Sequence, residues 1–317
     1  MQGFHPDMPA ATYHADPCPA PSLSASVASI LLDRSPLHAW HVHPRLNPAG
    51  ARAKEPTRAM EIGMAAHKLI LGRGRDVVVI DGDDYRKGEA KALRAEAYDA
   101  GHAPILAADL IKADAIAAAV LRAVGRVPGC DGFQDAASEV VAIARDPATG
   151  VWLRGMIDRL EDRGTGAILW DVKSGDLSAA PSGLGRRMAG MSMEIQAALY
   201  ERIVATLRPE LAGRIRFRWL FAENDPPHSV TIAELDNVGL EIGRRKVSAA
   251  VALWHRCLSA GSWPGYPAAI ITAEFPGYAH SQWIEREMAD PMLAGVTYGL
   301  PGETVDRPDR SFTRIIA

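Results

Sequence analysis

Asp171 and Lys173 are two residues apart in the stretch ILWDVKSGD, residues 168–176. Side chains alternate between the two faces of a strand, so the carboxylate and the ammonium project from one face and Val172 from the other. The apolar run before them predicts a buried strand, and SGD predicts a turn after it. An exposed ion pair that contributes little to stability is one interpretation. The other is a reactive carboxylate and amine held side by side at the end of a strand.

A second carboxylate, Asp158, ends the run LRGMID upstream of this pair. We expect a strand at 151–161 to pair antiparallel with one at 167–175, which brings Asp158 close to Asp171 at the same sheet edge. Two carboxylates in a mainly apolar setting repel each other unless a cation lies between them. Because carboxylate oxygens suit Mg²⁺ or Mn²⁺, the sequence predicts a divalent-metal site, to which Glu139 can add a further carboxylate.

Two expected helices carry further polar side chains that can reach this site. Gln196 and Tyr200 are four residues apart on a helix at 191–207, so they share a face of it. His67 follows Gly63 by four residues on an earlier helix, and the missing side chain at Gly63 allows a backbone or a ligand to approach closely. Each has a purely structural alternative: a half-buried helix face, a core histidine and, for Glu139, an exposed strand start.

Composition limits the class of protein. The 317 residues are 48% hydrophobic and 23% charged, which is typical of a soluble globular chain, and no apolar run approaches the length of a membrane span. The N-terminus lacks the pattern of a secretory signal. Cys18, Cys130 and Cys257 are far apart and odd in number, so we expect reduced thiols in a cytoplasm and no iron–sulfur cluster.

The order of the expected elements predicts an α/β fold, with a mixed central sheet that contains an antiparallel meander and is flanked by helices. The strands are expected at 76–81, 139–146, 151–161, 167–175, 214–223 and 228–235, and the helices at 24–33, 57–71, 86–101, 107–125, 191–207 and 236–258. Ser24, Ser35 and Thr57 are expected to begin helices, with Pro36 in the first position of the second, and Gly72 is expected to end the third. We expect 1–22 to be a flexible N-terminal segment, 23–287 to form one domain and 288–317 to be a loosely held tail. Residues 182–190 resemble a phosphate-binding loop only loosely, and a mobile basic loop near the DNA path is the other interpretation. For His38, His41 and His43 we expect a solvated cluster, with metal binding as the alternative.

The basic side chains are mostly arginine, 28 against 7 lysines, in a chain of net charge −3. Local basic patches can bind phosphate even when the total charge is slightly negative. The clusters are Arg186 and Arg187; Arg214, Arg216 and Arg218; and Arg244 and Arg245. They are candidates for DNA contacts, and ordinary solubilising surface is the alternative for each.

Taken together, these residues resemble a known family. The series is G-x-x-x-H (Gly63, His67), Glu139, Asp158, D-x-K (Asp171, Lys173) and Q-x-x-x-Y (Gln196, Tyr200). It resembles the PD-(D/E)XK nuclease superfamily and, more narrowly, the RecE-like and phage λ-type exonucleases. The resemblance runs from residue 13 or so to about residue 285, and the "PD" element is "ID" here.

The resemblance implies a restriction-endonuclease-like core and a site role for each motif residue. Asp158, Asp171, the Val172 carbonyl and His67 would bind Mg²⁺ or Mn²⁺, Glu139 would assist a second ion, Lys173 would orient or deprotonate the attacking water, and Gln196 and Tyr200 would position the strand end. It further implies digestion of linear double-stranded DNA from its ends to give single strands for phage or prophage-type recombination. A homotrimer or homotetramer and a single-strand annealing protein as partner belong to the same implication.

Three other functions remain open at this point. A DNA-end binding protein on the same fold would lack a catalytic carboxylate or the lysine, and an endonuclease with the same core would cut circular DNA. A metal-dependent hydrolase of nucleotides or small phosphoesters would cleave mononucleotide esters and ignore linear DNA.

Overall fold

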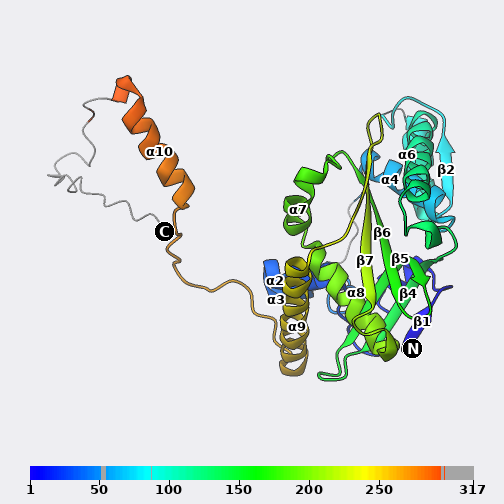
Figure 1. The fold of residues 1–317 in the computed structure, drawn as a ribbon, viewed down its shortest axis with the longest axis horizontal. Helices are drawn as coiled ribbons and strands as arrows, with labels where there is room; N and C mark the ends of the chain where they lie inside the picture. Colours follow the sequence, from blue (N-terminus) through cyan, green and yellow to red (C-terminus); the bar gives the residue numbers. More distant parts are fainter. Residues whose placement is uncertain (51–54, 87, 294–295, 297–317) are drawn as a thin grey trace. The chain divides into compact units, whose positions relative to one another are not determined.

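Six strands form the central sheet of the computed structural model, which describes residues 1–50, 55–86, 88–293 and 296. Their order across the sheet is β1 (Gly3–His5), β4 (Ala137–Arg145), β5 (Trp152–Asp162), β6 (Ala167–Gly175), β7 (Ile215–Glu223) and β8 (Val230–Ala233) (Figure 1). Neighbouring strands are antiparallel except for β6 and β7, which are parallel and are connected through α7 (Pro181–Gly190) and α8 (Met193–Leu207). This mixed sheet with a β4–β5–β6 meander confirms the predicted fold class.

Helices cover both faces of this sheet. On one face lie α2 (Ala25–Asp33), α3 (Pro36–Val42), α8 and α9 (Asn237–Ala260), and on the other lie α4 (Arg58–Leu71) and α6 (Ala107–Arg126) (Figure 1). Along β6, Leu169 packs in the core beneath α8 and α9, whereas Trp170 and Val172 pack beneath α4 and α6. The alternation continues to Asp171, whose carboxylate meets α8.

The remaining elements lie outside this three-layer arrangement. A two-stranded parallel sheet is formed by β2 (Val77–Ile80) and β3 (Ala103–Leu106), which are connected through α5 (Gly88–Asp99). The other elements are α1 (Ala10–His14), α10 (Gly277–Ala289) and three short 3₁₀ turns at Asp131–Phe133, Pro209–Leu211 and Pro291–Leu293. The six strands and six helices expected from the sequence are confirmed to within a few residues, and α3 begins at Pro36 as expected, but β1, β3, α1, α7 and α10 were not expected.

Helix ends follow the predicted capping chemistry. The side chains of Ser24, Ser35 and Thr57 each accept a hydrogen bond from a backbone N–H three residues on, at the start of α2, α3 and α4. Gly72 ends α4 with a left-handed φ of 69°. These caps fix where α4 begins and ends, and hence where its histidine lies.

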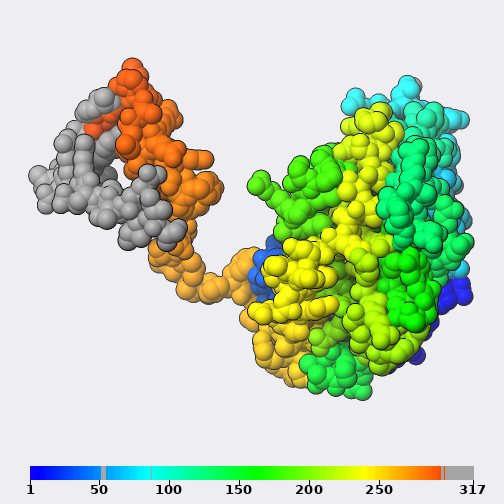
Figure 2. All heavy atoms as spheres, in the orientation of Figure 1, coloured from blue at the N-terminus to red at the C-terminus, as the bar shows by residue number. Residues whose placement is uncertain are grey.

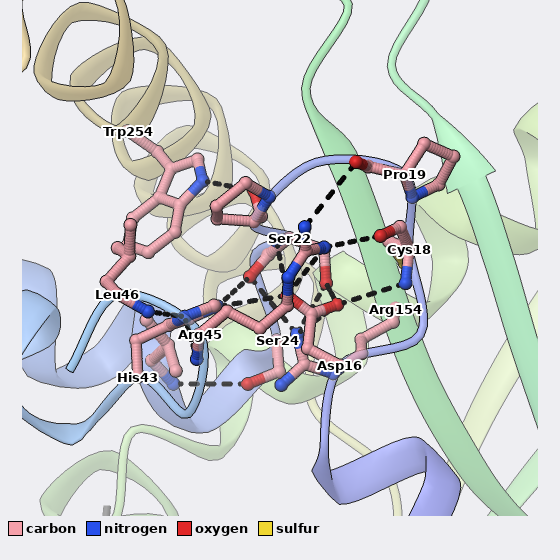
Figure 3. A network of polar contacts seen from close by, with 12 residues as sticks. Asp16, Cys18, Pro19, Ser22, Ser24, His43, Arg45, Leu46, Arg154 and Trp254 are labelled. Carbon is pink, nitrogen blue, oxygen red and sulfur yellow. Dashed lines mark hydrogen bonds and ion pairs between the residues drawn. The ribbon is translucent and has the colours of Figure 1, made fainter. Parts of the chain in front are cut away.

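The N-terminal segment differs from the expectation that residues 1–22 are flexible. β1 pairs with β4, and Tyr13 of α1 is buried. The fully buried Asp16 carboxylate lies 3.2 Å from both Arg154 of β5 and His43, and accepts hydrogen bonds from Ser22 (Figure 3). These anchors involve partners far along the chain, which a proline-rich composition does not reveal. His43 is therefore a core residue and not part of a solvated cluster.

Replacing Asp16 with asparagine is expected to lower the free energy of unfolding by about 3 kcal/mol at neutral pH, because the buried Arg154 charge loses its partner. Burial raises the pKa of Asp16. The His43 contact, the Arg154 charge and the Ser22 hydrogen bonds lower it by more than burial raises it, so the net pKa lies below its ordinary value of 3.8. A carboxyl group whose pKa is lower in the folded than in the unfolded protein stabilises the fold when the pH is above the unfolded-state pKa. This contribution is lost as the pH falls through the folded-state pKa.

The difference in unfolding free energy between wild type and Asp16→Asn should therefore be largest at neutral pH and shrink below about pH 4. Urea unfolding at neutral and acidic pH measures it, with Asp225→Asn in an exposed turn as the control. Equal stability of Asp16→Asn and wild type at neutral pH would show that the network does not anchor the segment.

Two further boundaries differ from expectation. Residues 182–190, expected as a mobile loop, form α7 with Pro181 in its first turn, and this helix projects from the surface in the space-filling view (Figure 2). The chain divides into a compact unit, Met1–Tyr266, and a second unit, Pro267–Ala317, so α10 falls outside the compact unit although the domain was expected to reach 287. Most of the expected tail, 288–317, lies outside the described residues. No helix in the described part of the chain is long and apolar enough to cross a membrane.

Candidate active site

Two neighbouring strands part where the acidic residues begin. Pairing between β5 and β6 runs through Leu160 with Leu169 and ends at Arg159 with Trp170. One more step in this register would pair Asp158 with Asp171. Instead, Asp158 Oδ2 accepts a hydrogen bond of 2.7 Å from the Val172 N–H. The carboxylate thus replaces the missing ladder bond where regular pairing of the two strands ends. The hairpin argument predicted that the two aspartates lie close together, but not this break in the pairing.

Glu139, on β4, lies beside the place where β5 and β6 stop pairing. The pairs Ser138 with Arg159 and Val140 with Ile157 place Glu139 opposite Asp158. Glu139 has a φ of 49°, in the left-handed region that non-glycine residues rarely adopt. Such a conformation costs of order 1 kcal/mol and persists where the surrounding structure enforces it, most often at functional sites. Here the surrounding strand pairs hold it, and its carboxylate faces the site.

His67 reaches the two acidic side chains from α4. Its Nε2 is 3.2 Å from Asp158 Oδ2, and its Nδ1 is 3.8 Å from Glu139 Oε1. Burial lowers the pKa of His67, but the charges of Asp158 and Glu139 outweigh it, so the net pKa is raised. A Cβ on Gly63 would lie 3.2 Å from Ser174 Oγ, so the glycine lets α4 approach the end of β6. This close approach agrees with the one expected at Gly63.

Lys173 and Gln196 each contact a different oxygen of the Asp171 carboxylate. Lys173 Nζ lies 2.5 Å from Asp171 Oδ2, and Gln196 Nε2 donates a hydrogen bond of 2.6 Å to Oδ1. Burial raises the pKa of Asp171, and the Asp158 charge adds to this although Lys173 and Gln196 oppose it. For Asp158, burial also raises the pKa, but His67, Lys173 and the Val172 N–H together lower it below its ordinary value. The site therefore holds two carboxyl groups with pKa values shifted in opposite directions.

Tyr200 occupies a more structural position than Gln196. It is buried, and its hydroxyl donates a hydrogen bond of 3.0 Å to the Met156 carbonyl and accepts one of 3.3 Å from the Met156 N–H. A Cβ on Gly155 would lie only 2.6 Å from the ring, so the ring packs directly on the β5 backbone. Tyr200 thus supports the strand that carries Asp158.

We expect Tyr200→Phe to lose about 1 kcal/mol of unfolding free energy, the net value of a typical intramolecular hydrogen bond, while KM for substrate stays unchanged. Thermal unfolding and steady-state kinetics measure the two effects, with the exposed Tyr278→Phe as the matched control. A raised KM with unchanged stability would instead place the hydroxyl in contact with substrate.

A cleft opens beside these residues, with a volume of about 670 Å³. Its lining includes residues of α4, the loop after α4, the end of β6 and Ala10 of the N-terminal segment. Its ionisable side chains are His67, Arg75, Glu139, Lys173 and Asp176. Sequence reasoning missed Arg75 and Asp176, and the glycine-rich context of Arg75, GRGR, is the signal that could have indicated it.

Most of the arginines proposed for DNA contact form ion pairs with carboxylates of this chain. Arg216 and Arg218 share Glu234, Arg244 forms a bidentate pair with Glu201, and Arg245 pairs with Glu241. Arg187 folds back onto the Leu177 and Ser178 carbonyls and the Phe221 ring. Arg186 and Arg214 are exposed and have no ion-pair partner among the described residues. The structure therefore leaves these two as the accessible cations of the proposed set.

The acidic residues do not yet form a closed metal site. Across the part of the chain that the structure describes, no group of three or more histidine, cysteine or carboxylate side chains is arranged to hold a metal ion. His67 and Lys173 instead contribute positive charge to the two aspartates. Asp171 Oδ2 is nevertheless buried and has no partner besides its ion pair with Lys173, and a buried carboxylate oxygen beside a second carboxyl group suits a hard cation.

Comparisons with known proteins identify the family of this chain. A family model of the PD-(D/E)XK nuclease superfamily matches residues 22–265, whereas no curated protein matches the chain. Among solved structures, the fold is similar to the crystal structure of a "putative exonuclease" from Eubacterium rectale, with a TM-score of 0.54 and 11% identity over 92% of this chain and 99% of that one. The crystal structure of SSO0001 matches with a TM-score of 0.25 and 11% identity, over 61% of this chain and 85% of that one. The family match includes Gly63, His67, both aspartates, Lys173 and Gln196, and the chain belongs to the PD-(D/E)XK nuclease superfamily.

Proposed function

We propose that the protein is a divalent-metal-dependent exodeoxyribonuclease that digests linear double-stranded DNA from its ends. The observation that carries this proposal is the convergence of Asp158, Asp171 and Lys173 where β5 and β6 part, beside an open cleft. The name of the structurally similar Eubacterium rectale protein supports exonuclease activity as the form of the reaction. Membership of the nuclease superfamily makes a phosphodiester the bond to be cleaved.

The donor set fits Mg²⁺, with Mn²⁺ as the alternative. Asp158 and Asp171 are the residues that would hold the ion, with the Val172 carbonyl and Glu139 beside them, because Mg²⁺ is usually held by one or two carboxylates together with water and substrate phosphate. When bound, a divalent ion lowers the pKa of water and stabilises charge on the phosphate. His67 would have to release Asp158 before it could act as a ligand itself.

The protein side chains have distinct tasks in this reaction. Burial lowers the pKa of Lys173, but the Asp171 and Asp158 charges raise it overall, so the resting side chain is an ammonium that can hold a water molecule and the phosphate oxygen it attacks. Gln196 orients Asp171 through its amide hydrogen bond. Glu139 lies opposite Asp158 and can assist a second ion or accept a proton from water.

The biological setting is also part of the proposal. The RecE-like and λ-type resemblance supports a homotrimer or homotetramer in the cytoplasm, which would supply single strands to an annealing protein during phage or prophage-type recombination. A closed ring would repeat the exposed Arg186 and Arg214 of each subunit around the duplex. Such a ring keeps the enzyme on DNA although its net charge is −3.

Incubation of the purified protein with end-labelled linear duplex tests this proposal. We expect digestion from the ends in Mg²⁺, none in EDTA, binding without turnover in Ca²⁺, and no cutting of covalently closed circles. Cleavage of circular DNA would identify an endonuclease, and end binding without cleavage in Mg²⁺ would identify a catalytically inactive binding protein. Light scattering reports the subunit number independently of the chemistry.

A further inference from the structure

The loop between α4 and β2 places an arginine at the rim of the active-site cleft. Its sequence is Gly72-Arg73-Gly74-Arg75, and Arg75 is exposed and lines the cleft together with His67, Glu139 and Lys173. Within the described residues, Arg75 has no ion-pair or side-chain hydrogen-bond partner, whereas Arg73 pairs with Asp7. Arg75 is thus the one cation of the described cleft lining that no carboxylate already engages, because His67 and Lys173 are paired with the aspartates.

The loop backbone is braced on both sides of this arginine. Arg73 donates hydrogen bonds to the Pro6 carbonyl and to Asp7, which fastens the loop to the N-terminal segment. Lys68 Nζ lies 3.1 Å from the Gly74 carbonyl and 3.2 Å from Asp76. Gly74 has a φ of 116°, which only glycine adopts without strain, and a Cβ there would lie 3.4 Å from Glu139 Oε1. The base of the Arg75 side chain is therefore fixed beside the catalytic carboxylates.

The negative charge around the cleft indicates what Arg75 can contribute to the binding of a DNA strand. Glu139 and Asp176 line the cleft, and Asp158 and Asp171 lie beside it. His67 and Lys173 offset only part of this negative charge, so the remainder opposes the approach of a polyanionic strand. A metal ion compensates this only at the phosphate being cleaved. A planar guanidinium binds a phosphate through two parallel hydrogen bonds, and it carries its charge at every working pH.

We propose that Arg75 binds a backbone phosphate next to the scissile one and so holds the DNA strand in the cleft. This inference rests on the proposed nuclease function and names a specific strand-binding residue for it. Arg75 acts on binding and not on the chemical step, since its place is at the rim and the Asp171–Lys173 pair lies at the end of β6.

The test is the salt dependence of DNA binding. Affinity for a short linear duplex is measured in Ca²⁺ at increasing KCl for wild type, Arg75→Gln, Arg75→Lys and the control Arg122→Gln on the exposed side of α6. We expect Arg75→Gln to bind about tenfold more weakly and to reduce the slope of log affinity against log salt by about one, because one phosphate contact is lost. Arg75→Lys should recover the slope but only part of the affinity, and Arg122→Gln should match wild type.

Single-turnover cleavage at saturating DNA in Mg²⁺ completes the test, and Arg75→Gln should stay within about threefold of wild type there, since only binding is affected. An unchanged salt slope in Arg75→Gln, or a loss confined to the cleavage rate, overturns the role of Arg75 while the nuclease function stands. A wild-type protein that neither binds nor cleaves duplex DNA overturns both proposals together.

Discussion

Asp171→Asn is expected to lower DNA cleavage by about a thousandfold or more, since the metal-binding carboxylates underlie several kcal/mol of transition-state stabilisation. The substitution keeps the shape of the side chain while it removes the charge that pairs with Lys173. Asp158→Ala should be at least as damaging, because it removes both a carboxylate and the hydrogen bond to the Val172 N–H. Single-turnover cleavage of a labelled linear duplex in Mg²⁺ measures both.

A control on the same strand separates chemistry from folding. Asp162 ends β5 four residues beyond Asp158, next to the turn into β6, where it is exposed and pairs with Arg208. Asp162→Asn should cleave like wild type, and all three variants should keep the wild-type circular dichroism spectrum. Full activity of Asp171→Asn would remove the metal site from these two strands and with it the proposed mechanism.

Lys173→Ala is expected to leave duplex binding in Ca²⁺ intact and to lower cleavage by at least about a hundredfold, the scale of a positioned acid–base group. The ammonium is held 2.5 Å from Asp171, so its loss removes the contact that orients this carboxylate and, in the proposed mechanism, the group that holds the attacking water. Lys112→Ala on the exposed surface of α6 is the matched control.

A second variant, Lys173→Arg, compared with Lys173→Ala, distinguishes the role of the amine from that of its positive charge. Lys173→Arg keeps the positive charge but not the compact geometry of an ammonium, so it should recover little of the cleavage. If Lys173→Ala cleaves at the wild-type rate, the Asp171–Lys173 contact is an ion pair without a part in the reaction.

Local patterns predicted the part of the site that lies on neighbouring strands. The spacing of Asp171 and Lys173 sets their common face, and the short turn before β6 brings Asp158 beside them, so both followed from strand geometry. Gln196 followed from the helix that comes after β6. Each of these relations spans few residues, which is why sequence alone predicted them.

The relations that sequence did not reveal are long-range or depend on a single torsion. Asp16 meets Arg154 of β5, far along the chain, and no periodicity in either segment indicates the other. The left-handed φ of Glu139 is imposed by its strand neighbours and has no sequence signature. Arg75 belongs to none of the motifs used above, because its proposed role depends on the bracing of its loop by Arg73 and Lys68.

The short β1 strand has a consequence for the behaviour of the protein in solution. Residues Gly3–His5 occupy the outer side of β4 opposite Val141, Ala142 and Ile143, which are among the most buried positions of the sheet. Without this cover, the apolar stretch 140–144 of β4 would present free N–H and C=O groups at the sheet edge, a template to which other chains add. Removal of the first residues should therefore turn a monodisperse sample into an aggregating one, even if the nuclease site itself stays intact.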